Sequence, residues 1–426
     1  MNTYLYPARE DWKEIVRRPT IDNSQLRDTV AGLLQQIREG GDKVLKELEA
    51  RFDHCTLDAL RVTDAEMQEA RQAVAPALAE AIGTASRNIA AFHEAQRFAG
   101  VRVETQPGVV CWQKSVPIGR VGLYVPGGTA PLFSTVLMLA IPAHIAGCKE
   151  IVLCSPPNRE GKVHPAILFA AQASGVNKIF KIGGIQAIAA MTYGTESVPK
   201  VYKIFGPGNQ YVTAAKQLVS LRDVAIDMPA GPSEVEVIAD GASNPEFIAA
   251  DFLSQAEHGA DSQAIMLTSE ESIVAPTKDA IRTQLAALPR KDITEKALSH
   301  SRIIVLRNEQ EVVDFTNMYA PEHLIIQTKN YAAIAEQINN AGSVFLGPYT
   351  PESAGDYASG TNHTLPTNGY AKAYSGVNLD SFIKKMTFQE ITSDGIKSLG
   401  STIQTMAAGE QLDAHRNAVT IRIESL

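Results

Sequence analysis

One short segment of the chain carries two side chains that could bind a metal ion. The segment Phe252-Leu-Ser-Gln-Ala-Glu-His-Gly259 has the pattern of an apolar helix that ends at a glycine. Gln255 and His258 are three residues apart, so both side chains can point from one face of the last turn. Two nitrogen or oxygen donors on one helical face are the beginning of a metal site, although a solvated helix end gives the same pattern.

Three more polar clusters lie downstream, and together with His258 they contain four of the nine histidines. A neutral imidazole can accept a proton near physiological pH, and a carboxylate beside it can activate water. Taken singly, each cluster also has a plain structural interpretation, such as a polar pair at the start of a strand or a histidine on a surface helix. The clusters are Ala320-Pro-Glu322-His323, Gly355-Asp356 with Thr361-Asn-His363, and Gly409-Glu410 with His415.

With Ser233 in Ala230-Gly-Pro-Ser-Glu234, this set of motifs resembles histidinol dehydrogenase over nearly the whole chain. That family oxidises L-histidinol to L-histidine in two NAD-dependent steps. The resemblance implies that His323 takes the alcohol proton and that Glu322 activates the water for the second step. It implies one zinc ion per subunit, bound by Gln255, His258, Asp356 and His415. The implied substrate-binding residues are Ser233, Gln255, His258, His323, Asp356, His363, Glu410 and His415.

Three glycine-rich turns follow short apolar strands in the middle of the chain. Glycine lets backbone N–H groups approach a pyrophosphate at the start of a helix, although ordinary tight turns have the same composition. None of the turns is a G-x-G-x-x-G fingerprint, so we expect NAD to bind as a dissociable co-substrate. The resemblance implies NAD contacts from Tyr124, Gln186 and Asn209. The turns are Gly127-Gly128, Gly183-Gly184 and Gly206-Pro-Gly-Asn209.

Repeated strand, turn and helix units must position these residues. They predict an α/β fold of two Rossmann-like parallel-sheet modules, with a helical N-terminal region and a small C-terminal tail. The expected strands are 122–125, 150–154, 178–182, 201–205 and 224–227 in the first module, and 235–239, 264–268, 302–306, 324–327 and 343–346 in the second.

The predicted domains follow from these units and from the resemblance. An N-terminal arm, 1–20, precedes a metal-binding and catalytic domain made of 21–116 and 233–376, with an NAD-binding domain at 117–232 between its two parts. The tail, 377–426, is expected to be helical from Gly409 and to mediate dimerisation. The resemblance implies a homodimer in which Glu410 and His415 complete the site of the partner subunit.

Composition narrows the class of protein. The formal charge of −8 and the lack of a Lys/Arg block argue against a nucleic-acid partner. No apolar run is long enough to span a membrane, and the first residues do not have the pattern of a signal peptide. Four cysteines without CxxC spacing indicate reduced thiols in a cytoplasmic protein.

Two other functions fit parts of the pattern. A zinc hydrolase would use Glu322 to activate a metal-bound water, and a two-lobed binding protein would need no catalysis. Manganese or cobalt would suit the same ligands as zinc. Aldehyde oxidation often uses a cysteine nucleophile, but none of Cys55, Cys111, Cys148 and Cys154 has a recognisable base beside it, so we expect packing roles for them.

Overall fold

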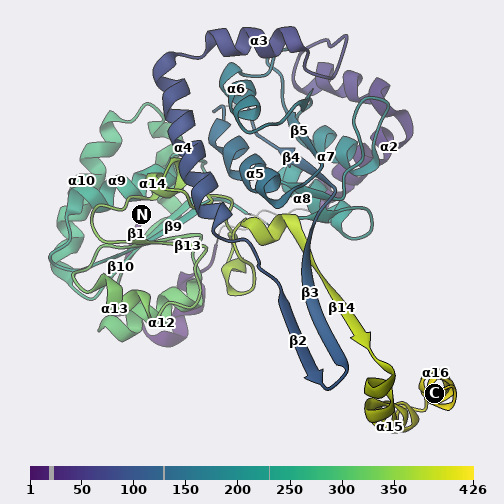
Figure 1. The fold of residues 1–426 in the computed structure, drawn as a ribbon. Coiled ribbons are helices and arrows are strands. Elements are labelled where there is room, and N and C mark those ends of the chain that lie inside the picture. The colour runs from purple at the N-terminus through teal and green to yellow at the C-terminus, as the bar shows by residue number, and fades with distance from the viewer. Residues whose placement is uncertain (19–23, 128–129, 230) are drawn as a thin grey trace.

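The computed structural model describes residues 1–18, 24–127, 130–229 and 231–426. Two parallel sheets covered by helices form the body, and an arm of antiparallel strands carries the C-terminal helices away from it (Figure 1). The predicted fold class is therefore confirmed. Gly128 of the first predicted turn, Ala230 of the Ser233 motif and the predicted boundary between residues 20 and 21 lie outside the described residues. No helix in the described part of the chain has the length and apolar character needed to cross a bilayer.

The first sheet has the strand order β6-β5-β4-β7-β8, and all neighbouring strands in it are parallel. One face packs against α5 and α6 and the other against α7 and α8. The elements are β4 (Arg120–Tyr124), α5 (Phe133–Ala146), β5 (Glu150–Ser155), α6 (Pro165–Ala173), β6 (Lys178–Lys181), α7 (Gly184–Tyr193), β7 (Lys203–Phe205), α8 (Gln210–Ser220) and β8 (Ala225–Ile226).

Three N-terminal helices form an outer layer on this first sheet, which differs from the predicted grouping of 21–116 with 233–376. The apolar stripe of α2, which includes Val30 and Ile37, packs in one core with α7 and α8. α3 contacts α6, and α4 contacts α5. The apolar spacing showed which face of each helix is buried, but it contained no information on which sheet would cover that face. These helices are α2 (Ser24–Phe52), α3 (Asp64–Ala73) and α4 (Pro76–Glu94).

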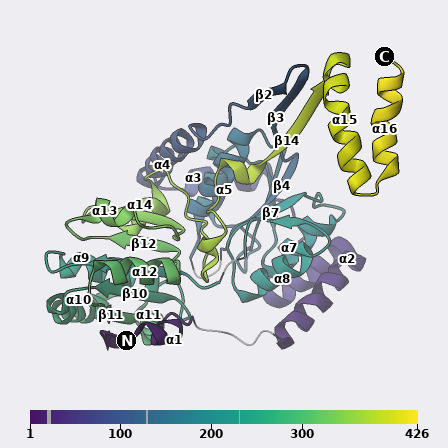
Figure 2. The same ribbon diagram turned by 90° about the horizontal axis from the view of Figure 1, so that it is seen from below.

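The second sheet has the order β1-β11-β10-β9-β12-β13, again with parallel neighbours. Figure 2 shows this sheet and its helices beside the first body. Its edge strand β1 comes from the predicted N-terminal arm and was not expected as a strand. The strands are β1 (Asn2–Leu5), β9 (Glu234–Ala239), β10 (Gln263–Thr268), β11 (Arg302–Val305), β12 (His323–Ile326) and β13 (Ser343–Leu346).

Helices cover both faces of the second sheet. α9, α10 and α11 share one core with it, and α1 and α12 pack with α13 on the other face. The helices are α1 (Trp12–Ile15), α9 (Pro245–Ala256), α10 (Val274–Ala287), α11 (Lys291–His300), α12 (Glu309–Tyr319), α13 (Tyr331–Ala335) and α14 (Glu352–Tyr357), with 3-10 turns η1 (Arg9–Asp11) and η2 (Glu271–Ile273).

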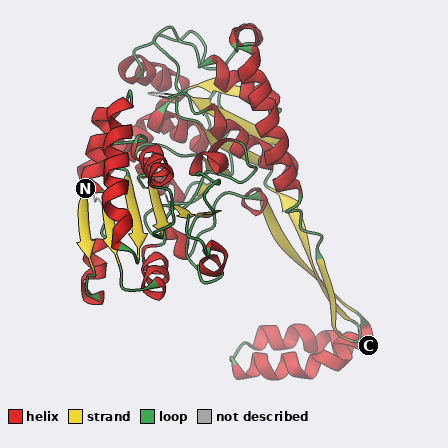
Figure 3. Ribbon diagram, turned by 90° about the vertical axis from the view of Figure 1, so that its left-hand side faces the viewer, coloured by secondary structure: helices red, strands yellow, loops and turns green. Residues whose placement is uncertain are grey.

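The arm is a three-stranded antiparallel ribbon in the order β14-β3-β2, and it was not predicted. It ends in the hairpin of α15 and α16, which lies far from both sheets (Figure 3). The tail is helical from Ser393, not only from Gly409, because Thr392 caps α15. The elements are β2 (Val101–Gln106), β3 (Val109–Pro117), η3 (Tyr370–Lys372), η4 (Leu379–Phe382), β14 (Ile383–Ile391), α15 (Ser393–Gly409) and α16 (Asp413–Glu424).

Candidate functional site

A cleft between the two bodies brings together residues from both parallel sheets. Its volume is about 630 Å³. The first body contributes the turn after β7, and the second contributes the segments that precede β9 and β12. The lining includes five residues that the sequence singled out, namely Asn209, Ser233, His258, Glu322 and His363.

The backbone at the start of β12 delivers Glu322 and His323 to this cleft. α12 ends at Tyr319, and Ala320 follows it in the left-handed conformation with φ 55°. This conformation is unusual for a residue with a side chain, and it turns the chain sharply before the strand. Glu322 and His323 are both buried; Glu322 lines the cleft, and His323 lies directly after it at the start of β12.

The Glu322 carboxylate is held by two hydrogen bonds to Oε2. The backbone N–H of Glu234 donates at 2.8 Å, and the side-chain amide of Gln255 donates at 3.3 Å. Both donors come from neighbouring elements of the second body, β9 and the last turn of α9. The carboxylate is therefore oriented before any ligand binds.

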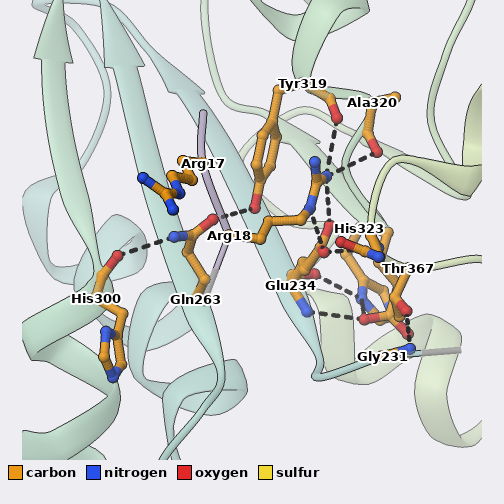
Figure 4. A network of polar contacts seen from close by, with 12 residues as sticks. Arg17, Arg18, Gly231, Glu234, Gln263, His300, Tyr319, Ala320, His323 and Thr367 are labelled. Carbon is orange, nitrogen blue, oxygen red and sulfur yellow. Dashed lines mark hydrogen bonds and ion pairs between the residues drawn. The ribbon is translucent and has the colours of Figure 1, made fainter. Parts of the chain in front are cut away.

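The ring of His323 is oriented by the same strand. Its Nδ1 lies 3.1 Å from the carbonyl oxygen of Glu234, and its Nε2 lies 3.4 Å from Asp356 Oδ1 (Figure 4 shows the Glu234 side). The Gln255 amide nitrogen lies 3.2 Å from the same Nδ1. A carbonyl can only accept, so in the tautomer that bonds to Glu234 the proton is on Nδ1, and Nε2 is the atom available for proton transfer. Burial alone would lower the pKa of His323, but the carboxylates of Glu352, Glu322 and Asp356 outweigh it and hold that pKa well above its usual value.

A group of potential metal ligands lies beside this pair. Ligand atoms of His258, Glu352 and Asp356 all lie within 4.8 Å of one another. Gln255 Oε1 and Asp356 Oδ1 are buried, and neither accepts a hydrogen bond within the described residues; Asp356 Oδ1 lies at ion-pair distance, 3.4 Å, from His323 Nε2. Buried oxygens without partners are costly, and a cation would satisfy both. An imidazole, carboxylates and an amide oxygen suit zinc, and they also suit manganese or cobalt.

Glu352 is a member of this group that the sequence analysis missed. It stands at the start of α14, one helical turn before Asp356, so both carboxylates lie on one face. Its side chain is almost fully buried, and burial raises its pKa to about 8. The i, i+4 spacing of Glu352 and Asp356 after Pro351 was the signal available in the sequence.

His363 and Ser233 lie at the same cleft. The His363 Nδ1–H donates to the backbone oxygen of Asp356 at 2.9 Å, and its Nε2 lies 3.1 Å from the Thr135 hydroxyl. Burial lowers the pKa of His363, which favours the neutral ring. His363 thus links the loop after α14 to α5 of the first body, while Ser233 lines the cleft just before β9.

The predicted NAD contacts lie at the carboxyl ends of strands in the first sheet. Tyr124 ends β4, and its hydroxyl accepts from the Gly184 N–H at 3.2 Å. Gln186 is buried and donates to Glu49 at 3.4 Å. Asn209 is exposed and caps α8, accepting from the backbone N–H groups of the first turn at 3.0 and 3.1 Å. Of these three predicted contacts, Asn209 lines the cleft described above.

The strand order of the first sheet places a switch point between β4 and β7. The chain leaves β4 toward β5 on one side and later returns to β7 on the other, which is where open parallel sheets bind nucleotides. Gly206, directly after β7, has φ 127°, and a Cβ atom there would lie 2.0 Å from the Tyr124 carbonyl oxygen. Only glycine permits this close approach of the two strand ends.

Glu410 and His415 do not join the cleft within one chain. Glu410 follows α15 and His415 lies in α16, and both are exposed at the far end of the arm (Figure 1). The single chain therefore brings Gln255, His258, Asp356 and His323 together, and leaves the two tail residues apart.

Comparisons with known proteins cover the whole chain. A family model described as histidinol dehydrogenase matches residues 16–423. Histidinol dehydrogenase of Bacteroides fragilis strain YCH46 is 64% identical over 426 residues, all of both chains. That of Escherichia coli K12 is 52% identical over 420 residues, 98% of this chain and 96% of the relative. The crystal structure of histidinol dehydrogenase from Elizabethkingia anophelis is 53% identical, covers 100% of this chain and 98% of its own, and gives a TM-score of 0.98.

Proposed function

The chain belongs to the histidinol dehydrogenase family, and from that premise we propose that it oxidises L-histidinol through L-histidinal to L-histidine in two NAD-dependent, zinc-dependent steps. One observation carries this proposal. A single cleft is lined both by Asn209, at the carboxyl end of the glycine-rich sheet, and by Glu322, next to His323 and the ligand group around Asp356.

In the first step, His323 removes the hydroxyl proton while the substrate loses a hydride to NAD. Nε2 is the atom for this transfer, because Nδ1 is bound to the Glu234 carbonyl. The ring must be neutral to act as a base. The carboxylates around it favour the charged form, and a bound cation that neutralised them would favour the neutral one.

In the second step, Glu322 activates the water that adds to the aldehyde. Its Oε2 is held by Glu234 N–H and by the Gln255 amide, so the carboxylate keeps one orientation through both steps. Ser233 and His363 line the cleft on either side and would bind the substrate. Zinc held by Gln255, His258 and Asp356 would bind the amino and imidazole nitrogens of the substrate and so orient it.

The position of the tail supports a shared site in a homodimer. Glu410 and His415 are exposed on an arm that extends away from the body of their own chain (Figure 3), and the resemblance requires both at a site. We expect mixed dimers of H323A and H415A subunits to recover activity, since half of their sites would contain both intact residues. No recovery despite demonstrated subunit exchange would refute a site shared between subunits.

The oxidation state of the cysteines indicates which cellular compartment suits the protein. All four are free thiols, and Cys55, Cys148 and Cys154 are buried. Free buried thiols fit a reducing compartment, so the proposed location is the cytoplasm.

The deciding measurement is NADH formation from L-histidinol by protein that has been stripped with a chelator and then given zinc again. We expect two NADH for each substrate, loss of activity on stripping, and recovery with zinc. Folded, zinc-loaded protein that forms no NADH would refute the proposal and leave hydrolysis at the metal as the competing function.

A further inference from the structure

The N-terminal arm sends one arginine into the polar network behind the catalytic pair. Arg18 Nε and Nη2 donate to the two carboxylate oxygens of Glu234 at 2.6 and 2.8 Å (Figure 4). This two-point contact fixes both the position and the plane of the guanidinium. The Glu234 side chain is almost fully buried, and that of Arg18 is 14% exposed. A paired, buried charge of this kind cannot move without leaving its partner uncompensated.

The same guanidinium also holds the end of α12. Its Nη2 donates to the Tyr319 carbonyl oxygen at 2.8 Å and lies 3.4 Å from that of Ala320. The carbonyls at a helix C-terminus have no partner within the helix, and here Arg18 supplies one. The guanidinium also packs over the Tyr319 ring at 4.1 Å from its centre. Arg18 thus braces the strained turn at Ala320, two residues before Glu322.

Glu234 passes this constraint on to both catalytic residues through its backbone. Its N–H donates to Glu322 Oε2, and its carbonyl oxygen accepts from the His323 ring and from the Gln255 amide at 3.2 Å. Its carboxylate additionally accepts from the Asn368 N–H at 2.7 Å. Movement of Glu234 would therefore displace the carboxylate of Glu322 and the ring of His323 together.

We propose that Arg18 is a positioning residue, which orients Glu322 and His323 for catalysis through Glu234 and the end of α12. The inference rests on the proposed roles of Glu322 and His323. Arg18 contacts both elements that position the turn at Ala320: it binds Glu234 in β9 and the Tyr319 carbonyl at the end of α12. This role gives the N-terminal arm a part in catalysis beyond adding strand β1.

The test is a double-mutant comparison of Arg18→Gln in the wild-type and Glu322→Gln backgrounds. A displacement near 1 Å of reacting groups can cost about 100-fold in rate, so we expect Arg18→Gln to lower kcat with L-histidinal about 10- to 100-fold. Arg18 lines the cleft, but its hydrogen bonds within the described residues go to Glu234, Tyr319 and Ala320 of the second body, so KM for NAD should stay within about twofold. In the Glu322→Gln background, Arg18→Gln should reduce the remaining rate with L-histidinal by less than about threefold, since the carboxylate proposed to activate water in this step is gone and the role proposed for His323 belongs to the first step.

Arg17→Gln is the matched control, because Arg17 is the neighbouring arginine and its side chain is 65% exposed. It should keep wild-type rates. If Arg18→Gln fails to fold by circular dichroism, Arg18→Lys takes its place, since lysine keeps the charge but cannot form the two-point contact. An equal loss in both backgrounds would mean a purely structural role and would overturn the inference, as would wild-type rates in Arg18→Gln. Wild-type rates in Glu322→Gln alone would instead refute the proposed role of Glu322.

Discussion

The two parallel sheets meet the cleft with opposite ends of their strands. The first sheet presents a carboxyl end, since Asn209 follows β7, whereas the second presents amino ends, since Ser233 and Glu322 precede β9 and β12. Open parallel sheets usually bind ligands at carboxyl ends, and only the first sheet follows that pattern. In the second sheet, the residues that line the cleft lie instead at the amino ends of β9 and β12, near the C-termini of α9 and α12.

Because the two sheets present opposite strand ends, the helix ends that they place near the cleft carry partial charges of opposite sign. α8 begins at the cleft, so its N-terminus and partial positive charge favour an anion such as a pyrophosphate. α9 and α12 end near Gln255 and Ala320, so their partial negative charges favour cations. One cleft therefore has an end suited to a dinucleotide and an end suited to a metal ion and an amine.

Replacing His323 is the strongest way to test whether the amino ends carry the chemistry. We expect His323→Gln to lower kcat by about 10²- to 10⁴-fold, because the proton acceptor is lost while the buried position stays filled. NADH formation from L-histidinol measures the effect. His300→Gln, at an exposed histidine, is the control and should stay at the wild-type rate. A His323→Gln variant within tenfold of wild type would remove the catalytic pair from the proposal.

Glu352 tests whether the amino ends favour a cation. Glu352→Gln removes a side chain that can ionise and bind a cation beside His258 and Asp356, so we expect zinc affinity to fall by about 10- to 100-fold. Competition with a zinc-binding dye measures the affinity directly, without reference to activity. Glu257→Gln, next to His258 in sequence but outside that group, should bind zinc normally. Unchanged affinity in Glu352→Gln would exclude its carboxylate from the metal site.

Two helix-capping asparagines, one after a strand of each sheet, test whether the carboxyl end of the first sheet binds NAD. Asn209 caps α8 at the cleft, and Asn244 caps α9 at the end of the second sheet that faces away from it. Replacing either with alanine should destabilise the protein by about 1 kcal/mol. Only Asn209→Ala should raise KM for NAD, by several-fold, with KM for L-histidinol unchanged. A KM for NAD that rises equally in both variants would trace the effect to stability.

The smallest effect is expected at Cys148, which precedes β5 at the amino end of the first sheet. Burial raises the pKa of this thiol to about 12, so it stays protonated and unreactive across the physiological range. Cys148→Ala should therefore retain both oxidation steps within about twofold, measured separately with L-histidinol and L-histidinal. Loss of only the second step would indicate a cysteine nucleophile and contradict the role given to Glu322.

The body of the fold could be predicted because its signals are local. Short apolar runs before glycine-rich turns located β4 to β7 and β9 to β13, and the resemblance to histidinol dehydrogenase is confirmed over nearly the whole chain. The arm could not be predicted in this way. β2 and β14 are mostly exposed, and the one short alternation in β2, at Val101 and Val103, lies on exposed side chains, so no buried face identified these strands. Which strand pairs with each sheet edge, and which sheet α2 covers, is decided by contacts between residues far apart in the sequence.

The residues of the candidate site can likewise be separated into those with a local sequence signal and those whose role depends on distant contacts. Gln255 with His258 and Glu322 with His323 are recognisable as close pairs in the sequence. Arg18 and Glu352 are not, because each acquires its role from a partner that only folding supplies, Glu234 in one case and the ligand group in the other. A lone arginine before a proline has no spacing that distinguishes it from surface residues, and the four-residue spacing of Glu352 and Asp356 becomes informative only once Asp356 is taken as a ligand.

The pairing of β3 with β14 has a consequence for synthesis on the ribosome. Between Pro117 and Ile383, which face each other in the ribbon, the chain contains almost all of both parallel sheets. At about 5–20 residues per second, the nascent chain waits on the order of tens of seconds between making the two strands. During that interval the β2–β3 hairpin has an open edge that can pair with other chains. The three-stranded arm can therefore be completed only after almost all of both parallel sheets has been synthesised.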